Sequence, residues 1–143
     1  MNFVDSVLIS APAGDVWRVF TDVERWPDWT PTVRRAALVE GAGVEPGARV
    51  RMRQPRLPTM TWAVTALEPG VSWTWEARSP GVRTVARHTL TPQGPGETLV
   101  EQEIEQTGPL AAVAGRLTGG LTRRYLAQEG AGLKARCEAA ARA

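Results

Sequence analysis

Residues 69–90 read PGVSWTWEARSPGVRTVARHTL and carry the pattern that decides the fold. Apolar and polar residues alternate on either side of Pro80-Gly81, which predicts two β-strands joined by a tight turn. The inward face of the first strand carries Val71, Trp73, Trp75 and Ala77, and that of the second carries Thr84, Ala86, His88 and Leu90. Consecutive strands joined this tightly predict an antiparallel sheet with one buried face.

The alternation continues in both directions from this hairpin. Strands are predicted over residues 33–40 and 48–53 and from Met60 onward, and the chain returns from a turn at residues 92–96 through Val100 to Gln106. Their inward faces carry Val50, Met52 and Gln54, then Met60, Trp62, Val64 and Ala66, then Val100, Gln102, Ile104 and Gln106. On the outward face, Arg83 and Arg87 are expected to lie opposite the acidic row Glu101, Glu103 and Glu105, where unlike charges support strand pairing.

Helical patterns lie toward the two ends of the chain. A strand over residues 3–10 precedes Pro12, which suits the first position of a short helix, and Pro27 is expected to end or kink the segment that follows. A second helix is predicted from Pro109 onward. It carries one apolar stripe of Leu110, Val113, Ala114, Leu117 and Leu121 and another of Leu126, Leu133 and Cys137. The two stripes do not align at about 100° per residue, so a break or bend is predicted at Gly119-Gly120.

The composition is that of one globular domain spanning residues 1–143. The net charge is +2, and the arginines at positions 49, 51, 53 and 56 are expected to form a solvated face, because the nearby aromatic residues point inward and cannot stack on nucleic acid bases. The single cysteine, Cys137, excludes an internal disulfide and suits a reducing compartment. With one histidine and no close carboxylate cluster, we expect no metal and no other cofactor. We find no signal peptide or membrane-length apolar run, and expect a cytoplasmic protein without integral membrane association.

Several short motifs together resemble one known superfamily. They are Ile9 with Ala11-Pro12, Val16-Trp17, Asp22, Trp26, Trp29 with Pro31, Gly47, Gln54-Pro55, Trp62-Ala63-Val64-Thr65, Trp75, Pro80-Gly81, His88, Gly108-Pro109-Leu110, Glu129 and Gly132-Leu133-Lys134. Over nearly its whole length the chain resembles the START-like, or SRPBCC, superfamily, close to the polyketide cyclase/dehydrase family. The resemblance implies an α+β helix-grip fold, like that of the birch-pollen allergens, in which a curved antiparallel sheet surrounds a long C-terminal helix with a cavity between them. Members include lipid and sterol carriers as well as polyketide aromatases and cyclases, so the fold does not decide the function.

The inward strand faces, together with Trp29, supply a candidate ligand site. Its members are Trp29, Met52, Gln54, Met60, Trp62, Trp73, Trp75, His88 and Gln102. A mostly aromatic wall with a few polar groups has the composition of a small-molecule pocket. The alternative is that the tryptophans fill a solid core. Several rigid rings on adjacent strands are hard to pack without space, which favours a cavity.

His88 is the only histidine and the candidate catalytic residue. An ordinary pKa of about 6.5 suits acid/base catalysis, whereas a neutral, hydrogen-bonded ring would orient a ligand. Since no second residue is an evident partner for His88, a structural or ligand-orienting role is favoured. Gln54 and Gln102 would hydrogen-bond either a ligand or the backbone. Tyr125 and Glu129 share one face of the last helix and are expected to be solvated.

The leading hypothesis is binding of a hydrophobic or aromatic small molecule, polyketide-like or lipid-like, between the sheet and the C-terminal helix. The alternative is a polyketide cyclase, aromatase or dehydratase that uses the same cavity with His88 as acid/base. Positioning alone accelerates such reactions, so few catalytic residues are required. A protein-binding role for the outer sheet face is disfavoured by its charged rows. The expected partner is a small molecule rather than nucleic acid, and the chain is expected to be a monomer or homodimer.

Overall fold

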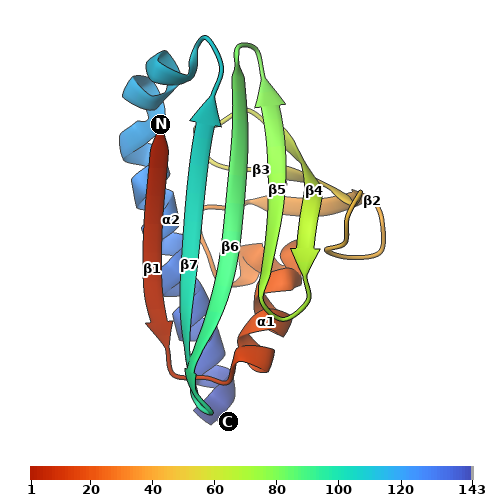
Figure 1. Ribbon diagram of the computed structural model, residues 1–143, viewed down its shortest axis with the longest axis vertical. Helices are drawn as coiled ribbons and strands as arrows, with labels where there is room; N and C mark the ends of the chain where they lie inside the picture. Colours follow the sequence, from red (N-terminus) through yellow and green to blue (C-terminus); the bar gives the residue numbers. More distant parts are fainter. Residues whose placement is uncertain (143) are drawn as a thin grey trace.

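The computed structural model describes residues 1–142, in which seven antiparallel strands form one sheet and helices cover one of its faces (Figure 1). The strands are β1 (Asn2–Ile9), β2 (Arg35–Glu40), β3 (Arg49–Arg53), β4 (Met60–Glu68), β5 (Ser72–Ser79), β6 (Val82–Gly94) and β7 (Glu97–Thr107). Their order in the sheet is β1-β7-β6-β5-β4-β3-β2, so the first strand pairs with the last. The helices are α1 (Ala13–Thr21), the short 3-10 helix η1 (Val23–Asp28) and α2 (Ala111–Arg142).

The long helix α2 runs along the sheet behind β1 and β7, and α1 covers the same face beside it (Figure 1). This arrangement confirms the α+β helix-grip architecture. The alternation around Pro80-Gly81 is also confirmed, because Trp73 and Trp75 on β5 are buried opposite His88 and Ala86 on β6. The inward face of the hairpin therefore supplies the centre of the core.

Two residues that were predicted to face inward, Ala66 and Val71, are exposed instead. A register shift between Val64 and Ala66 turns the strand, so that Ala66 is exposed and the half-buried Leu67 lies opposite Trp73. Val71 lies in the turn before β5, where its N–H donates to the Glu68 carbonyl, and its side chain is exposed. One extra residue in a strand reverses which side chains face the core.

The outer face of the sheet carries ion pairs between neighbouring strands. Arg87 on β6 contacts Glu103 and Glu105 on β7 at 3.2 and 3.3 Å, as predicted for this row. Arg83 differs from the prediction, because the register places it opposite Thr107 and its guanidinium contacts Glu76 on β5 at 2.6 Å.

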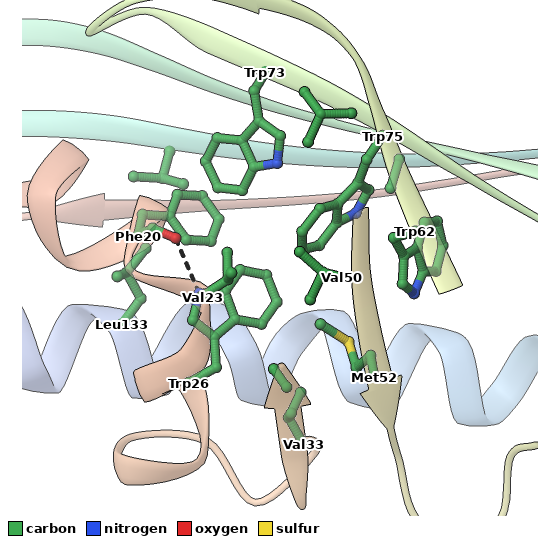
Figure 2. Close-up of a cluster of buried hydrophobic side chains, with 14 of the residues drawn as sticks. Phe20, Val23, Trp26, Val33, Val50, Met52, Trp62, Trp73, Trp75 and Leu133 are labelled. Carbon is green, nitrogen blue, oxygen red and sulfur yellow. Dashed lines mark hydrogen bonds between the residues drawn. The ribbon is translucent and has the colours of Figure 1, made fainter. Parts of the chain in front are cut away.

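The segment between β1 and β2 brings aromatic rings onto the inner face of the sheet. Pro12 is the N-cap of α1, so the helix begins one residue later than predicted, and Pro27 lies within η1 rather than ending it. Phe20 of α1 and Trp26 of η1 stack with ring centroids 5.6 Å apart, and the indole N–H of Trp26 donates to the Phe20 carbonyl at 2.9 Å. Figure 2 shows these rings meeting Trp73 and Trp75 from the sheet, with Leu133 of α2 beneath them.

The apolar stripe predicted for the first half of α2 is wrong, and so is the predicted break at Gly119-Gly120. The helix begins at Ala111 and continues without a break through Gly119-Gly120. Its buried residues there are Ala111, Gly115 and Gly119, whereas Leu110, Val113 and Leu117 are exposed. The reason is steric: a Cβ at Gly115 would collide with the Met1 side chain, and one at Gly119 would lie 3.4 Å from the Phe3 ring. Close approach to β1 thus requires small residues on this face.

Among residues 1–142, no helix combines the length and the apolar character needed to cross a membrane.

Candidate ligand cavity

A cavity of about 200 Å³ lies between the first half of α2, the inner sheet face and the loop that joins β3 to β4. Its apolar wall is formed by Leu57, Pro58, Met60, Trp62, Val82, Ile104, Ala114 and Leu126. Its polar groups belong to Gln54, Ser79, Thr84, Gln106, Thr118, Thr122, Tyr125 and Glu129. An apolar wall that also carries hydroxyl, amide and carboxyl groups suits a small molecule with both apolar and hydrogen-bonding parts.

A smaller cavity of about 50 Å³ adjoins the first and shares several wall residues with it. The shared side chains include Gln54, Trp62 and Glu129. Of the predicted site residues, Met52, Trp75, His88 and Gln102 border this smaller cavity, while Met60 borders only the larger one.

Trp29 and Trp73 border neither cavity. Trp73 is 1% exposed, stacks on the His88 ring at a centroid distance of 4.0 Å and meets Phe20 edge-on at 4.7 Å. Trp29 lies 5.4 Å from Trp26 by ring centroids, and its backbone faces Gly132 of α2. Trp29 and Trp73 therefore pack in the core beside the cavities, and Figure 2 shows Trp73 among the other core rings.

His88 is held as a neutral ring within this core. Its side chain is buried, and Nδ1 lies 3.2 Å from the Trp73 carbonyl, which can only accept, so Nδ1 carries the proton. Burial lowers the pKa of His88 to about 3, although the hydrogen bond to Trp73 acts in the opposite direction. At neutral pH the imidazole is uncharged and Nε2 is its remaining acceptor.

Glu129 is buried between the two cavities, which corrects the prediction of a solvated Tyr125–Glu129 pair. It is 7% exposed, and its Oε1 accepts a hydrogen bond from the Thr32 hydroxyl at 3.0 Å. The hydroxyl groups of Thr30 and Thr32 are hydrogen-bonded to each other at 2.9 Å. Burial raises the pKa of Glu129 to about 7; the Thr32 hydrogen bond opposes this rise and the charge of Asp5 adds to it.

Tyr125 holds the cavity's outer loop in place. Its hydroxyl donates to the Pro55 carbonyl, which ties α2 to the β3–β4 connection. The signal that reveals Glu129 is its spacing from Leu126 and Leu133, since all three lie on the buried stripe of α2. A carboxyl on such a stripe has to enter the interior with the leucines.

The larger cavity also presents unpaired polar atoms. Trp62 Nε1 and Gln106 Oε1 are buried and have no hydrogen-bond partner within residues 1–142. A buried donor or acceptor without a partner is costly, so both atoms favour a hydrogen-bonding group in the cavity. Gln102 differs, because its amide donates to the Leu126 carbonyl at 3.4 Å and so supports α2.

Within residues 1–142, no group of three or more histidine, cysteine, aspartate or glutamate side chains is placed to hold a metal ion.

A curved sheet that holds a long C-terminal helix over an apolar cavity defines the START-like, helix-grip class of proteins. A sequence profile described as "Polyketide cyclase / dehydrase and lipid transport" matches residues 1–138, and the chain belongs to that family. A comparison with curated protein sequences found no match.

Solved structures agree on the fold. A START superfamily protein from Mycobacterium smegmatis superposes with a TM-score of 0.75 at 18% identity, covering 96% of this chain and 97% of the other. The Zhui aromatase/cyclase from a Streptomyces species gives 0.79 at 16% identity, covering 96% and 93%. A hypothetical protein from Helicobacter pylori gives 0.81 at 10% identity, covering 96% and 88%. At these identities the similarity establishes the fold alone.

Proposed function

We propose that the chain binds a neutral hydrophobic or aromatic small molecule, polyketide-like or lipid-like, in the cavity under α2. The observation that carries this proposal is an apolar cavity of about 200 Å³ that contains buried hydrogen-bonding atoms without protein partners. Met60 and Trp62 supply apolar contact, and Gln54 supplies a polar group. Met52, Trp75, His88 and Gln102 shape the inner end, while Trp29 and Trp73 support the wall from the core.

The polar atoms define the expected ligand chemistry. Trp62 Nε1 donates to a ligand oxygen, and Gln106 Oε1 accepts from a ligand hydroxyl. Glu129 donates when protonated, which its pKa of about 7 permits below neutral pH. An anionic ligand would have to lie beside Glu129 in an apolar enclosure, so a ketone, ester or alcohol fits better than a carboxylate.

Filling the cavity is expected to reduce ligand affinity. Ala114 is half-buried and lines the cavity, whereas Ala112 is exposed on the same helix. In Ala114→Trp the indole occupies the ligand's space, so the affinity for 2-acetylnaphthalene, measured by titration calorimetry, should fall by roughly tenfold or more. Ala112→Trp, with the same added bulk, should retain the parent affinity. Equal affinity in the two variants would place the binding site elsewhere.

Proton transfer is a second candidate function, favoured by Glu129 rather than by His88. Glu129 borders both cavities and its pKa of about 7 leaves it part ionised at neutral pH, as a general base requires. His88 has its Nδ1 proton committed to Trp73, and burial lowers its pKa to about 3, which makes it a weak base. In a cyclase or dehydratase built on this cavity, Glu129 would move the proton and His88 would orient the substrate.

A chromogenic base-catalysed reaction tests this second function. In 5-nitrobenzisoxazole, transfer of the ring C–H proton to a carboxylate breaks the N–O bond and releases a coloured cyanonitrophenolate. Glu129→Gln is expected to lower turnover by about hundredfold, because it removes the base and keeps its shape. His88→Gln should stay within a few-fold of the parent. Absence of turnover in the parent above buffer would leave ligand binding as the only proposed function.

A further inference from the structure

An apolar ridge lies on the solvent side of α2 beside the cavity. It consists of Leu110, Val113 and Leu117, which are 49%, 53% and 80% exposed. Leu110 directly precedes α2, and its carbonyl accepts a hydrogen bond from the Ala114 N–H. The spacing of three and four residues therefore places the three side chains on one stripe, across the helix from the buried Ala111, Gly115 and Gly119. Single exposed leucines are common on protein surfaces, but three along one stripe form a patch that favours an apolar partner.

The surroundings of this ridge are basic. From Gln106 to Gln128 the chain has no acidic residue, while it carries Arg116, Arg123 and Arg124. The β3–β4 loop, which Tyr125 ties to the same helix, adds Arg56. Arg123 lies over the Phe3 ring at 5.0 Å, and Arg56, Arg116 and Arg124 form no ion pair within the described part of the chain. Free arginines around an apolar ridge match an anionic, apolar surface.

The ridge lies on the same turns of α2 as part of the cavity wall. Ala114 and Thr118 line the cavity, as do Leu57 and Pro58 of the β3–β4 loop. Each of these two helix residues follows a ridge residue in sequence and so lies about 100° around the helix from it, which places the ridge beside the cavity wall.

We propose that the ridge and its arginines dock this protein onto an anionic membrane surface, with the adjoining cavity wall held close to the lipid. The docking stands on its own observations, and ligand exchange between the cavity and the lipid rests on the proposed function. A second copy of the chain is a poorer occupant, because a symmetric contact brings the same arginines together. Anionic lipid offers negative headgroups over an apolar layer, which complements both parts of the surface.

Vesicle sedimentation tests the docking directly. The parent should bind vesicles of phosphatidylglycerol mixed with phosphatidylcholine and should not bind pure phosphatidylcholine. Arg116→Gln/Arg124→Gln is expected to weaken binding by roughly thirtyfold, since each arginine at an anionic surface contributes about fivefold. Arg136→Gln/Arg142→Gln removes the same charge about 30 Å away along the same helix and should bind as the parent does.

The apolar contribution has its own matched pair. Val113→Gln/Leu117→Gln should lose vesicle binding by tenfold or more, because each exposed apolar side chain inserted at the interface is removed. Val4→Gln/Leu8→Gln changes two other exposed apolar residues, 64% and 45% exposed on β1, and should bind normally. Circular dichroism checks that all four variants fold.

Three results would overturn the docking proposal. They are a parent that ignores anionic vesicles, vesicle binding unaffected by the two ridge substitutions, and concentration-dependent dimerisation that those substitutions abolish. The vesicle assay contains no cavity ligand. A parent that binds 2-acetylnaphthalene but not vesicles therefore loses the docking proposal alone, and the reverse result removes only the proposed function.

Discussion

Glu129→Gln is expected to stabilise the protein at pH 8 by about 3 kcal/mol relative to its effect at pH 4. Folding raises the pKa of Glu129 from 4.5 to about 7, so the folded state binds a proton that the unfolded chain releases between these values. The stabilising contribution of Glu129 is complete below pH 4.5 and is lost as pH rises toward 7, at about 1.4 kcal/mol per pKa unit. Glutamine keeps the shape and cannot ionise, so the variant avoids this loss.

Urea unfolding of parent and variant across this pH range measures the effect. Taking the difference between the two proteins also cancels His88, whose lowered pKa makes the folded state lose stability as pH falls below about 6.5. Glu138→Gln is the control on the same helix: Glu138 is partnered by Lys134, which lowers its pKa and gives the opposite sign. If the free energies of unfolding of the parent and Glu129→Gln changed with pH in the same way, folding would not raise the pKa of Glu129.

Gly132→Ala is expected to destabilise the fold by about 3 kcal/mol, in spite of alanine's higher helix propensity. A Cβ at this position would collide with the Trp29 carbonyl oxygen and lie 3.1 Å from its carbonyl carbon and 3.2 Å from the indole ring. Since backbone cannot move aside as a side chain does, α2 would have to shift away from the turn after η1. That shift would loosen the packing of Leu133 in the hydrophobic core.

Gly120→Ala is the matched control for this substitution. Nothing lies within 4 Å of its Cβ position, and the residue is exposed on the same helix, so alanine should stabilise by about 0.5–1 kcal/mol. Thermal or urea unfolding of the two variants measures both signs at once. A stabilised Gly132→Ala would show that α2 does not approach Trp29 as closely as the structure has it.

Much of the fold follows from the sequence because strand faces and turns leave local signals. The alternation around Pro80-Gly81 predicts both the hairpin and the burial of Trp73, Trp75 and His88. Two features escape such reasoning. The register shift in β4 comes from how one strand fits its neighbour. The first half of α2 buries glycines because Met1 and Phe3, more than 100 residues away, occupy the space beside them.

The site was less predictable than the fold for the same reason. Gln54, Met60 and Trp62, assigned to inward strand faces from the sequence, line the larger cavity. Whether a ring lines a cavity or fills a core depends on its neighbours from other elements. Trp73, for example, is packed into the core by Phe20 of α1. Glu129 escaped prediction because a carboxyl on a helix is usually solvated, and its spacing from Leu126 and Leu133, which places it on the buried stripe of α2, was given too little weight. The assembled fold encloses it beside Thr32.

The closely spaced tryptophans of the core also give the protein an intrinsic fluorescence probe of cavity occupancy. Trp62 at the cavity wall is 5.7 Å from Trp75 by ring centroids, Trp75 is 5.9 Å from Trp73, and Trp26 is 5.6 Å from Trp75. At such separations excitation passes between indoles faster than it is emitted. One quenching molecule beside Trp62 therefore darkens the group as a whole, and occupancy becomes visible without a label.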